Sequence, residues 1–462
     1  MRKGGAGEMP NKGKRSLWLA GFFAAFMFLQ FTVLALCNRA GEGCLSVEDR
    51  EGVYYLLQVF VILGFLAYAA SNRLVRASRA AVAVPLGLFL VGGAILLAAD
   101  RGSLFYLIAA YGTVFCLGFV GGAVYERMSA ATAAGARTAR AMGLGCAAAT
   151  ALQYLLQLQW GVMPLLSLFM LAALVLLGLA LLRPDPAGEG TPPAIEKTPA
   201  RRLVFTLLIA AALLLFNGFY NGYIHHLQVR SGYTDYNVYT WPRLMMIPVY
   251  LLFALIGDRR QGRLVPLTAL CVALAALLNS VLSGSAGAYW LNMCLFYCAV
   301  ASAAAYYNLT FWRLAQGTRR PVLWASAGRI MDSVVVLLTY LLRVSTLSSA
   351  LVLALDVAGL VLVLLLMTLG GDLDLAKRKE REPEAPPPPR EDPVELLAAR
   401  FALTPAELRL LRELVGTEDK QEAIAVRLGM SVNTLRHHVT AIYRKTGAET
   451  RAGLVRLCSE KE

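Results

Sequence analysis

Residues 429–448, GMSVNTLRHHVTAIYRKTGA, hold three cations and no carboxylate, although acidic residues flank the segment on both sides. If Ser431 caps a helix here, Leu435, Val439 and Ile442 fall on one side and form an apolar stripe suited to a core. The opposite side then carries polar and basic side chains, namely Asn433, Arg436, His437, Thr440 and Arg444. Such a face has the chemistry to bind base edges and phosphates in a DNA major groove.

Neighbouring helical segments are predicted to position this helix. Thr404 and Glu407 match a capping box with Pro405 at the first helical position, which begins a helix that runs to about Val415. A second helix, KQEAIAVRL, ends at Gly429, and a fourth, ETRAGLVRLC, follows the basic one. A short helix, PVELLAARF, leads into the set. The sequence therefore predicts a four-helix domain with a helix-turn-helix at 394–462.

This domain resembles the LuxR family of DNA-binding domains over about Leu403–Leu457. The matching positions are Glu407, Ile424, Ala425, Leu428, Ser431, Thr434, Leu435, Arg436, His438, Ile442, Lys445, Gly447 and Arg451. The resemblance implies that Arg436, His437 and Thr440 face bases of double-stranded DNA. It implies backbone contacts from Lys420, Asn433, Thr434, Arg444 and Lys445, and a homodimer formed through the fourth helix. A helical module that never touches DNA is the alternative.

Most of the chain before residue 370 is apolar. Of the 462 residues, 57% are hydrophobic and 16% are charged, and the formal net charge is +14. Twelve runs are long and apolar enough for membrane helices. They start near Leu17, Val53, Ala80, Leu104, Ala141, Val162, Leu203, Trp241, Leu264, Ala288, Val322 and Leu347. The chain is thus expected to be an all-α polytopic membrane protein with an appended domain.

The apolar runs form a repeat. Each run of the first six has a counterpart about 185 residues later, as expected for a duplicated transporter-like bundle. The predicted parts are a terminal segment at 1–16, two six-helix bundles at 17–182 and 203–369, and a central loop at 183–202. A linker at 370–393, rich in proline and charge, is expected to be extended.

Lysine and arginine are distributed unevenly between the two sets of loops. The loops between successive apolar runs are counted from the N-terminus. The N-terminal segment and the even-numbered loops hold most of the loop lysines and arginines, whereas the odd-numbered loops hold no lysine. The positive-inside rule then places both ends of the chain in the cytoplasm. The apolar run that follows the basic start is too long for a signal peptide, so we expect a retained first helix. Together with the family of the C-terminal domain, this implies a multi-pass protein of the bacterial cytoplasmic membrane.

The membrane region resembles the major facilitator superfamily. The likeness covers roughly 17–369 and rests on the helix count, the division into six and six, the topology and the loop GDRRQGR at Gly257–Arg263. That family often carries a D-R-x-G-R motif in the same loop. Here the glycine comes one residue late, and the equivalent loop of the first half, SNRLVRASR, lacks the acidic residue. The resemblance implies the architecture of a transporter, whereas transport itself stays open.

Polar residues inside the apolar runs are candidates for a ligand cavity, since charge in hydrocarbon is kept where it finds partners. Two groups stand out: Arg329, Asp332 and Asp356 in the last two runs, and Asn217, Tyr220 and Asn221 in the seventh. A structural ion pair is the alternative for Arg329 and Asp332. Hydrogen bonding between helices is the alternative for the seventh run.

No catalytic constellation is present in the sequence. There is no phosphate-binding glycine loop, no nucleophile with a matched base, and no cysteine with metal-ligand spacing, so neither a cofactor nor a metal is expected. The sequence favours a membrane-embedded transcriptional regulator whose twelve-helix part senses a small molecule or a membrane state. The alternative is a secondary transporter with an accessory DNA-binding module.

Overall fold

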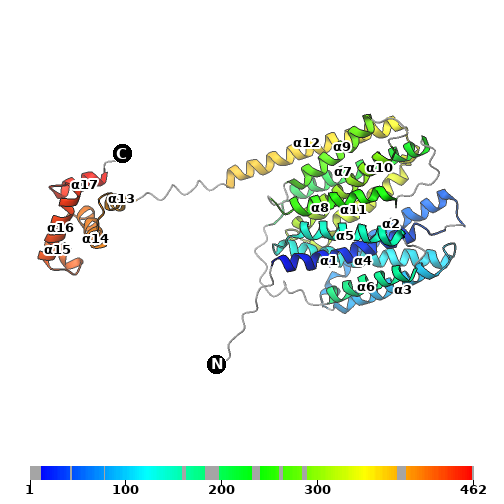
Figure 1. The fold of residues 1–462 in the computed structure, drawn as a ribbon, viewed down its shortest axis with the longest axis horizontal. Coiled ribbons are helices and arrows are strands. Elements are labelled where there is room, and N and C mark those ends of the chain that lie inside the picture. The colour runs from blue at the N-terminus through cyan, green and yellow to red at the C-terminus, as the bar shows by residue number, and fades with distance from the viewer. Residues whose placement is uncertain are drawn as a thin grey trace, which may run out of the picture. The chain divides into compact units, whose positions relative to one another are not determined.

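The structure is a computed structural model, and it describes residues 12–41, 44–77, 79–158, 163–182, 197–230, 240–259, 264–282, 289–381 and 392–459. Contacts divide the chain into two units, Met1–Asp372 and Leu373–Glu462 (Figure 1). Across the described ranges every regular element is a helix. The all-α prediction is therefore confirmed for the residues that the structure describes.

The first unit contains twelve α-helices in its described part. They are α1 (Lys12–Cys37), α2 (Val47–Ala77), α3 (Ala83–Ala98), α4 (Leu104–Ala133), α5 (Thr138–Leu158), α6 (Met163–Leu182), α7 (Ala200–Arg230), α8 (Met246–Ile256), α9 (Leu264–Leu282), α10 (Tyr289–Ala315), α11 (Pro321–Leu341) and α12 (Ser349–Arg381). Within the described ranges, nine of these helices have an apolar stretch long enough to cross a bilayer. The helices α2, α3 and α8 have shorter apolar stretches. The protein is a multi-pass membrane protein.

The predicted segment ends need correction at three places. α1 begins at Lys12 and α7 at Ala200, so both helices start before the predicted bundle boundaries. α12 continues past the predicted end near Leu369 to Arg381, so the extended linker is wrong for its first part. Most residues of the segment DLDLAKRKER are good helix formers, namely Leu, Ala, Lys, Arg and Glu, which favours continuation of the helix. The proline run lies outside the described residues.

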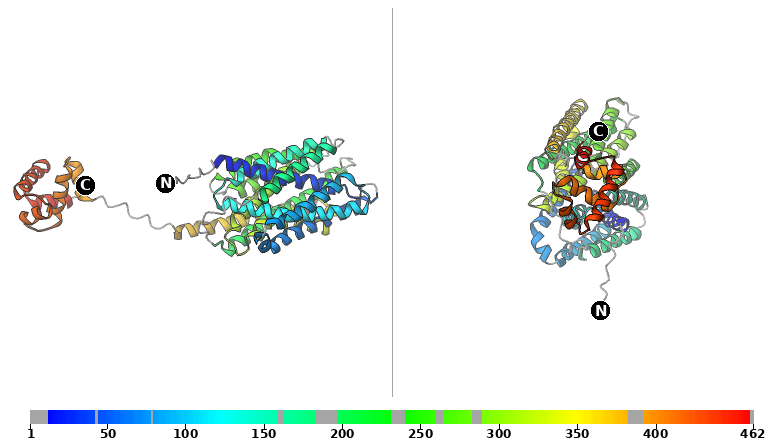
Figure 2. Two further views of the ribbon diagram at one scale, coloured as in Figure 1. Left: turned by 90° about the horizontal axis from the view of Figure 1, so that it is seen from below. Right: turned by 90° about the vertical axis from the view of Figure 1, so that its left-hand side faces the viewer.

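Helices of the two sequence halves pack directly against each other. α5 lies along α8, α2 lies along α11, and α4 contacts α10 (Figures 1 and 2). At the first of these contacts, a Cβ atom on Gly143 would lie 2.3 Å from the carbonyl oxygen of Tyr250. The halves therefore approach to backbone distance, which only a residue without a side chain permits.

The second unit has its own hydrophobic core. Its helices are α13 (Pro393–Arg400), α14 (Pro405–Gly416), α15 (Gln421–Arg427), α16 (Val432–Thr446) and α17 (Arg451–Ser459). The core is formed by buried aliphatic side chains, among them Leu410, Leu411, Leu414, Ile424, Leu435, Val439, Ile442 and Leu454. The predicted capping box of Thr404 and Glu407 is present, which confirms the predicted start of α14.

The contact between α2 and α4 yields a test of the packing. A Cβ atom on Gly118 would lie 2.4 Å from the carbonyl oxygen of Val61, so Gly118→Ala must push the helices apart. We expect a loss of about 1–3 kcal/mol, seen as a lower Tm of the detergent-purified protein. The matched control is Gly112→Ala in the same helix, where the new Cβ meets nothing within 4 Å. Equal melting temperatures for the two variants would contradict the close packing.

Candidate functional site

The surface of α16 divides into a buried and an exposed face. Leu435, Val439 and Ile442 are buried in the core of the second unit. The opposite face is exposed to solvent and consists of Asn433, Thr434, Arg436, His437, Thr440 and Arg444. His438 lies between the two faces and is half-buried. The structure thus places the predicted base-facing residues together on one exposed surface, which we call the α16 polar face.

A tight turn connects α15 to α16. Gly429 adopts a left-handed backbone with φ of 65°, which suits a residue without a side chain. The Ser431 side chain then caps α16 by accepting a hydrogen bond of 3.1 Å from the backbone N–H of Thr434. The two hydroxyl oxygens of this pair are 2.7 Å apart. Because the cap fixes the first turn, the side chains of the α16 polar face start from a defined position.

Lys445 has a different role from the predicted one. Its Nζ atom donates to the carboxylate of Glu407 at 2.6 Å and to the carbonyl oxygen of Ala402 at 3.4 Å. Glu407 is itself 4% exposed and accepts a bond of 2.7 Å from the backbone N–H of Thr404. The ammonium group therefore pairs with a carboxylate inside the unit, and we remove Lys445 from the set of phosphate contacts.

The hydrogen bond from Lys445 and the backbone N–H of Thr404 hold the pKa of Glu407 far below its usual range, at about 2. Both interactions favour the charged carboxylate over the neutral acid. The Glu407–Lys445 pair thus links the start of α14 to the last turn of α16 in the ionised state.

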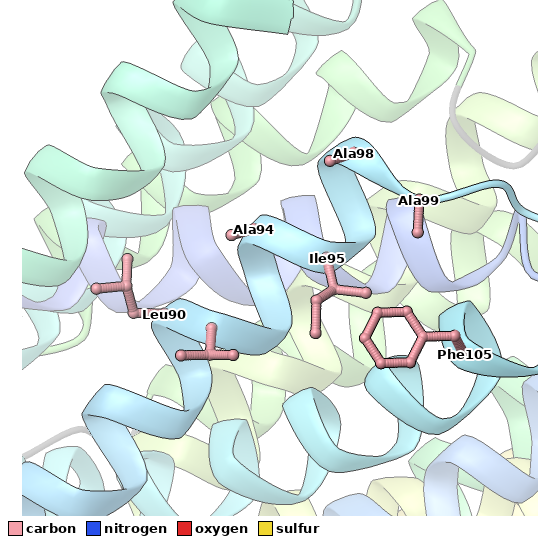
Figure 3. A pocket seen from close by; sticks show the side chains of 7 residues that line it. Leu90, Ala94, Ile95, Ala98, Ala99 and Phe105 are labelled. Carbon is pink, nitrogen blue, oxygen red and sulfur yellow. The ribbon is translucent and has the colours of Figure 1, made fainter.

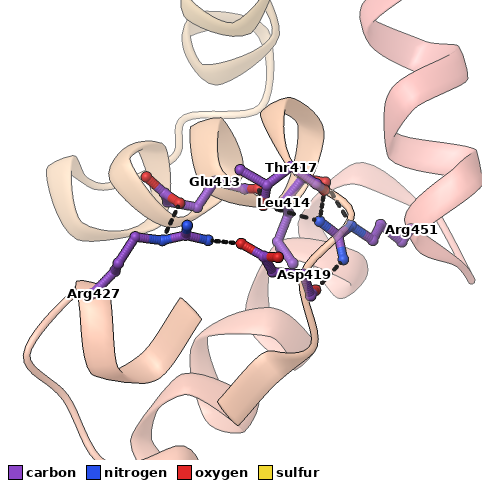
Figure 4. A network of polar contacts seen from close by, with 6 residues as sticks. All are labelled: Glu413, Leu414, Thr417, Asp419, Arg427 and Arg451. Carbon is purple, nitrogen blue, oxygen red and sulfur yellow. Dashed lines mark hydrogen bonds and ion pairs between the residues drawn. The ribbon is translucent and has the colours of Figure 1, made fainter. Parts of the chain in front are cut away.

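Arg451 connects the start of α17 to the last turn of α14 and to the loop between α14 and α15. Its guanidinium donates to three backbone carbonyls, those of Leu414 at 2.7 Å, Asp419 at 2.6 Å and Thr417 (Figure 4). From the sequence, Arg451 was identified only as a position that matches the LuxR family, and these hydrogen bonds were not predicted. Arg427 of α15 also bonds to Glu413 and Asp419, so the same loop is held from two sides. The loop carries the exposed Lys420 at the start of α15.

Two of the predicted cavity residues of the membrane unit pair with each other. Arg329 and Asp332 make an ion pair within α11, and both lie within electrostatic reach of Tyr125 of α4 and Tyr307 of α10. The ion pair is the structural alternative predicted for these residues. Because its aromatic neighbours come from both sequence halves, this pair lies near the contact between the halves.

A second set of polar residues lies among α7, α9 and α10. The Tyr220 hydroxyl donates to the side-chain oxygen of Asn292 at 2.8 Å, which is the predicted hydrogen bonding between helices. Ser280 and Tyr223 extend this network. Asp356 of α12 is fully buried. A cavity lined by all six predicted residues stays a prediction.

Arg243 is a buried charge that the sequence interpretation missed. It lies in a short 3₁₀ segment, Trp241–Met245, directly before α8. Its guanidinium donates to the side-chain oxygen of Gln153 in α5 at 3.0 Å and lies 4.6 Å from the ring centroid of Phe31 in α1. The missed signal was an arginine within an apolar run, WPRLMMIPVY. Arg243 joins the two halves at the end predicted to be external.

The loop with the facilitator-like motif joins the halves at the opposite end. The carboxylate of Asp258 accepts bonds of 3.0 and 2.9 Å from the backbone N–H groups of Ala139 and Arg140. These groups belong to the first turn of α5, so an anion from the second half caps a helix of the first half. Nearby, the Ser129 hydroxyl donates to the Trp312 carbonyl at 2.8 Å. Polar contacts thus join the two halves at this end of the bundle.

Two hollows in the membrane unit are apolar. One is an open depression on α3 and the start of α4, lined by Leu90, Val91, Ala94, Ile95, Ala98, Ala99 and Phe105 (Figure 3). The other lies inside the first half between Phe26, Leu117 and Leu177. Neither contains a predicted cavity residue. Among the described residues no group of three or more His, Cys, Asp or Glu side chains is arranged to hold a metal ion.

Comparisons with known proteins identify the fold of the membrane unit. The structure matches the crystal structure of the human organic anion transporter MFSD10 (TETRAN) with a TM-score of 0.54 and 16% sequence identity. The match covers 78% of this chain and 100% of that chain. No family model and no curated protein matches the sequence. At this sequence identity the likeness concerns the fold alone, and it supports the major facilitator-like architecture expected for the membrane unit. It offers no support for a LuxR-type domain.

The pair of Glu407 and Lys445 makes the stability of the second unit depend on pH. Because the pKa of Glu407 is lowered to about 2, its stabilising effect is present above its usual pKa near 4.3 and is lost as the pH falls toward 2. We expect Glu407→Gln and Lys445→Met to reduce this acid-dependent loss, measured by chemical unfolding of a fragment from Leu373 onward. Arg444→Met, which removes the neighbouring exposed cation, should unfold like the wild type. An unchanged pH profile in Lys445→Met would contradict the assigned role.

Proposed function

We propose that this protein is a membrane-embedded transcriptional regulator of the LuxR type, in which a major facilitator-like unit controls a DNA-binding unit. The observation that carries the proposal is the α16 polar face. Six exposed polar side chains on this helix lie opposite a fully packed stripe, and the helix follows a tight turn after α15. This is the arrangement by which a recognition helix enters a major groove.

The side chains of this face suggest a division of contacts. Arg436 can donate two parallel hydrogen bonds to the O6 and N7 atoms of guanine, and His437 and Thr440 lie on the same exposed side. The Thr440 hydroxyl donates to the Arg436 carbonyl at 2.9 Å, so it meets DNA mainly as an acceptor. Phosphate contacts are assigned to Lys420, Asn433, Thr434 and Arg444, without Lys445.

The proposed DNA complex contains two copies of the chain. α17 packs against α13 and α14 and keeps Val455 41% exposed, which leaves an apolar position for a second copy. Two copies would read two half-sites, and their spacing would follow from the dimer geometry. We therefore propose a homodimer through the second unit when it is bound to double-stranded DNA.

The membrane unit is the proposed sensor. A small molecule can shift its conformation only by the difference in affinity between the two states, typically about 1–3 kcal/mol. The contacts between the halves at Arg243 and Asp258 are two places where such states can differ. A change in the membrane unit would alter the proximity of two protomers or the availability of the second unit.

A secondary transporter with an accessory DNA-binding module is the second candidate. The observation that favours it is the fold of the membrane unit, which is shared with a protein described as an organic anion transporter. Solute uptake or efflux that persists after removal of residues 382–462 would identify this candidate. If removal of these residues abolished gene regulation, and the intact protein showed no measurable solute flux, the regulator would be favoured.

Localisation in the bacterial cytoplasmic membrane, with both termini in the cytoplasm, is part of the proposal. The uneven distribution of lysine and arginine supports it. Reporters fused after Arg202 and after Leu369 should therefore report a cytoplasmic position, and one fused near Gly232 an external position. Protease or alkaline-phosphatase accessibility after Leu369 on the outer side would remove DNA binding from consideration.

The central test is DNA binding by charge variants of the second unit. Arg436→Ala should weaken binding to the preferred duplex by about 1–3 kcal/mol and relax its sequence preference, because a base contact is lost. Arg444→Ala should weaken binding to every duplex similarly and reduce the salt dependence, because a phosphate contact is lost. Fluorescence anisotropy at several salt concentrations measures both effects.

The matched control is Arg400→Ala in α13, which removes the same charge from a helix that packs against α14 and α17. Its binding should equal that of the wild type. If Arg436→Ala lost affinity equally for the preferred and for random duplexes, the base contact would be wrong. If Arg400→Ala lost as much as Arg436→Ala, the α16 polar face would not be the DNA-binding surface.

A further inference from the structure

The segment before α7 packs against the turn that connects α10 to α11. The Thr198 hydroxyl donates a hydrogen bond of 3.0 Å to the carbonyl oxygen of Leu314. The backbone N–H of Thr198 donates a second one, of 2.9 Å, to the carbonyl oxygen of Gly317. Both segments belong to the end of the bundle at which the Ser129 hydroxyl bonds to Trp312. Residues next to Thr198 therefore lie close to residues next to Gly317.

Basic residues flank this contact on both of its segments. The exposed ones are Lys197, Arg201, Arg202, Arg319 and Arg320, and we call them the α7–α11 basic patch. No aspartate or glutamate occurs in 197–205 or in 313–324. Among the residues that the structure describes, no member of the patch forms an ion pair with a carboxylate. The patch therefore carries positive charge that the described part of the protein does not pair.

One of these charges lies where the lipid-facing surface of α7 begins. The guanidinium carbon of Arg201 is 5.8 Å from the ring centroid of Phe205, so this charge stays on the face of α7 that bears the ring. Val204 and Leu208 share that face at helical spacing and are 51% and 46% exposed. Exposed aliphatic side chains on a membrane-spanning helix contact lipid tails. The charge of Arg201 thus lies at the edge of the tail region, where lipid headgroups are found.

α11 enters the membrane beside α7. Its membrane-spanning stretch starts at Pro321, directly after Arg320, and that of α7 starts at Ala200, directly before Arg201. Trp324, one turn into α11, is partly exposed, and tryptophan side chains are enriched at the level of the headgroups. The α7–α11 basic patch therefore lies at the headgroup level on both of its segments.

The position and the charge of the patch select its partner. A phospholipid with an anionic headgroup brings a phosphate to this level, and guanidinium groups bind phosphate oxygens through paired hydrogen bonds. The acyl chains of such a lipid can lie against Val204 and Leu208. A soluble phosphate compound matches the charges but leaves this apolar face without a partner. An anionic lipid uses both features, and the bilayer supplies it.

We propose that the α7–α11 basic patch binds the headgroup of an anionic phospholipid, whose acyl chains lie along the exposed apolar face of α7. Arg201 and Arg202 hold the phosphate from α7, and Arg319 and Arg320 hold it from the turn before α11. The site is separate from the predicted cavity residues. It goes beyond the proposed regulation and does not depend on DNA binding by the second unit.

The repeat in the chain supplies a matched control. α5 is the counterpart of α11 in the first half, and Arg137 and Arg140 are exposed at its start. The positive-inside rule treats this pair like Arg319 and Arg320. At the start of α5, however, the carboxylate of Asp258 already accepts two backbone hydrogen bonds. A specific lipid site therefore predicts different results for two pairs of the same charge.

The test measures the Tm of the full chain in detergent while phosphatidylglycerol or phosphatidylcholine is added at equal mole fraction. A lipid that binds only the folded protein raises its Tm in a saturable manner. We expect phosphatidylglycerol to raise the wild-type Tm more than phosphatidylcholine does. The double variant Arg319→Gln with Arg320→Gln should need more phosphatidylglycerol for half-saturation, by about fivefold for each cation removed. Its Tm in phosphatidylcholine should equal that of the wild type, because both side chains are exposed.

Two controls make the result specific. The double variant Arg137→Gln with Arg140→Gln should respond to phosphatidylglycerol like the wild type. Inorganic phosphate, which has the charge but no acyl chains, should not raise the wild-type Tm above that in sodium chloride of equal ionic strength.

Equal responses of the wild type to the two lipids would overturn the proposal. So would an unchanged half-saturation in Arg319→Gln with Arg320→Gln, or an equal loss in both double variants, which would indicate bulk charge. A rise in Tm with inorganic phosphate would identify a soluble anion as the partner and would also overturn it. None of these results bears on DNA binding, so this proposal can fail while the proposed function stands.

Discussion

A polar group inside a bilayer is stable only beside a partner, and this constraint explains the arrangement of the membrane unit. The ion pair of Arg329 and Asp332, the contact of Arg243 with Gln153 and Phe31, and the bond from Tyr220 to Asn292 each satisfy it. The same requirement singles out Asp356, whose carboxylate oxygens have no hydrogen-bond partner among the residues that the structure describes. Partners that come from different helices also decide which helices pack together.

The second unit is stabilised by the hydrophobic effect, in which burial of apolar side chains away from water supplies most of the stability. Leu435, Val439 and Ile442 pack in its core. The opposite side of α16 is exposed and takes no part in the core. Polar links at the margin of this core, from Lys445 to Glu407 and from Arg451 to the α14–α15 loop, hold the helices in place. A rigid scaffold with an exposed polar helix face suits the reading of a rigid duplex.

The sequence was sufficient where a pattern repeats along the chain. Long apolar runs and the period of Leu435, Val439 and Ile442 predicted the helices well, because both signals are local. Partners distant in sequence could not be predicted: Lys445 has the charge of a phosphate contact, and its pairing with Glu407 follows only from the fold. Similarly, the sequence did not show that the Tyr220 hydroxyl bonds to Asn292 of another helix. The helix beyond Leu369 was missed because nearby prolines outweighed good helix formers.

The account depends most on the claim that the full chain, held in the membrane, contacts specific DNA. Crosslinking and immunoprecipitation of the intact protein from its own cells, followed by sequencing of the recovered DNA, measures this directly. The account predicts a small number of discrete genomic sites that share a sequence, and their loss in cells that carry Arg436→Ala. Recovery of DNA without any enriched site, or the same sites with Arg436→Ala, would contradict it.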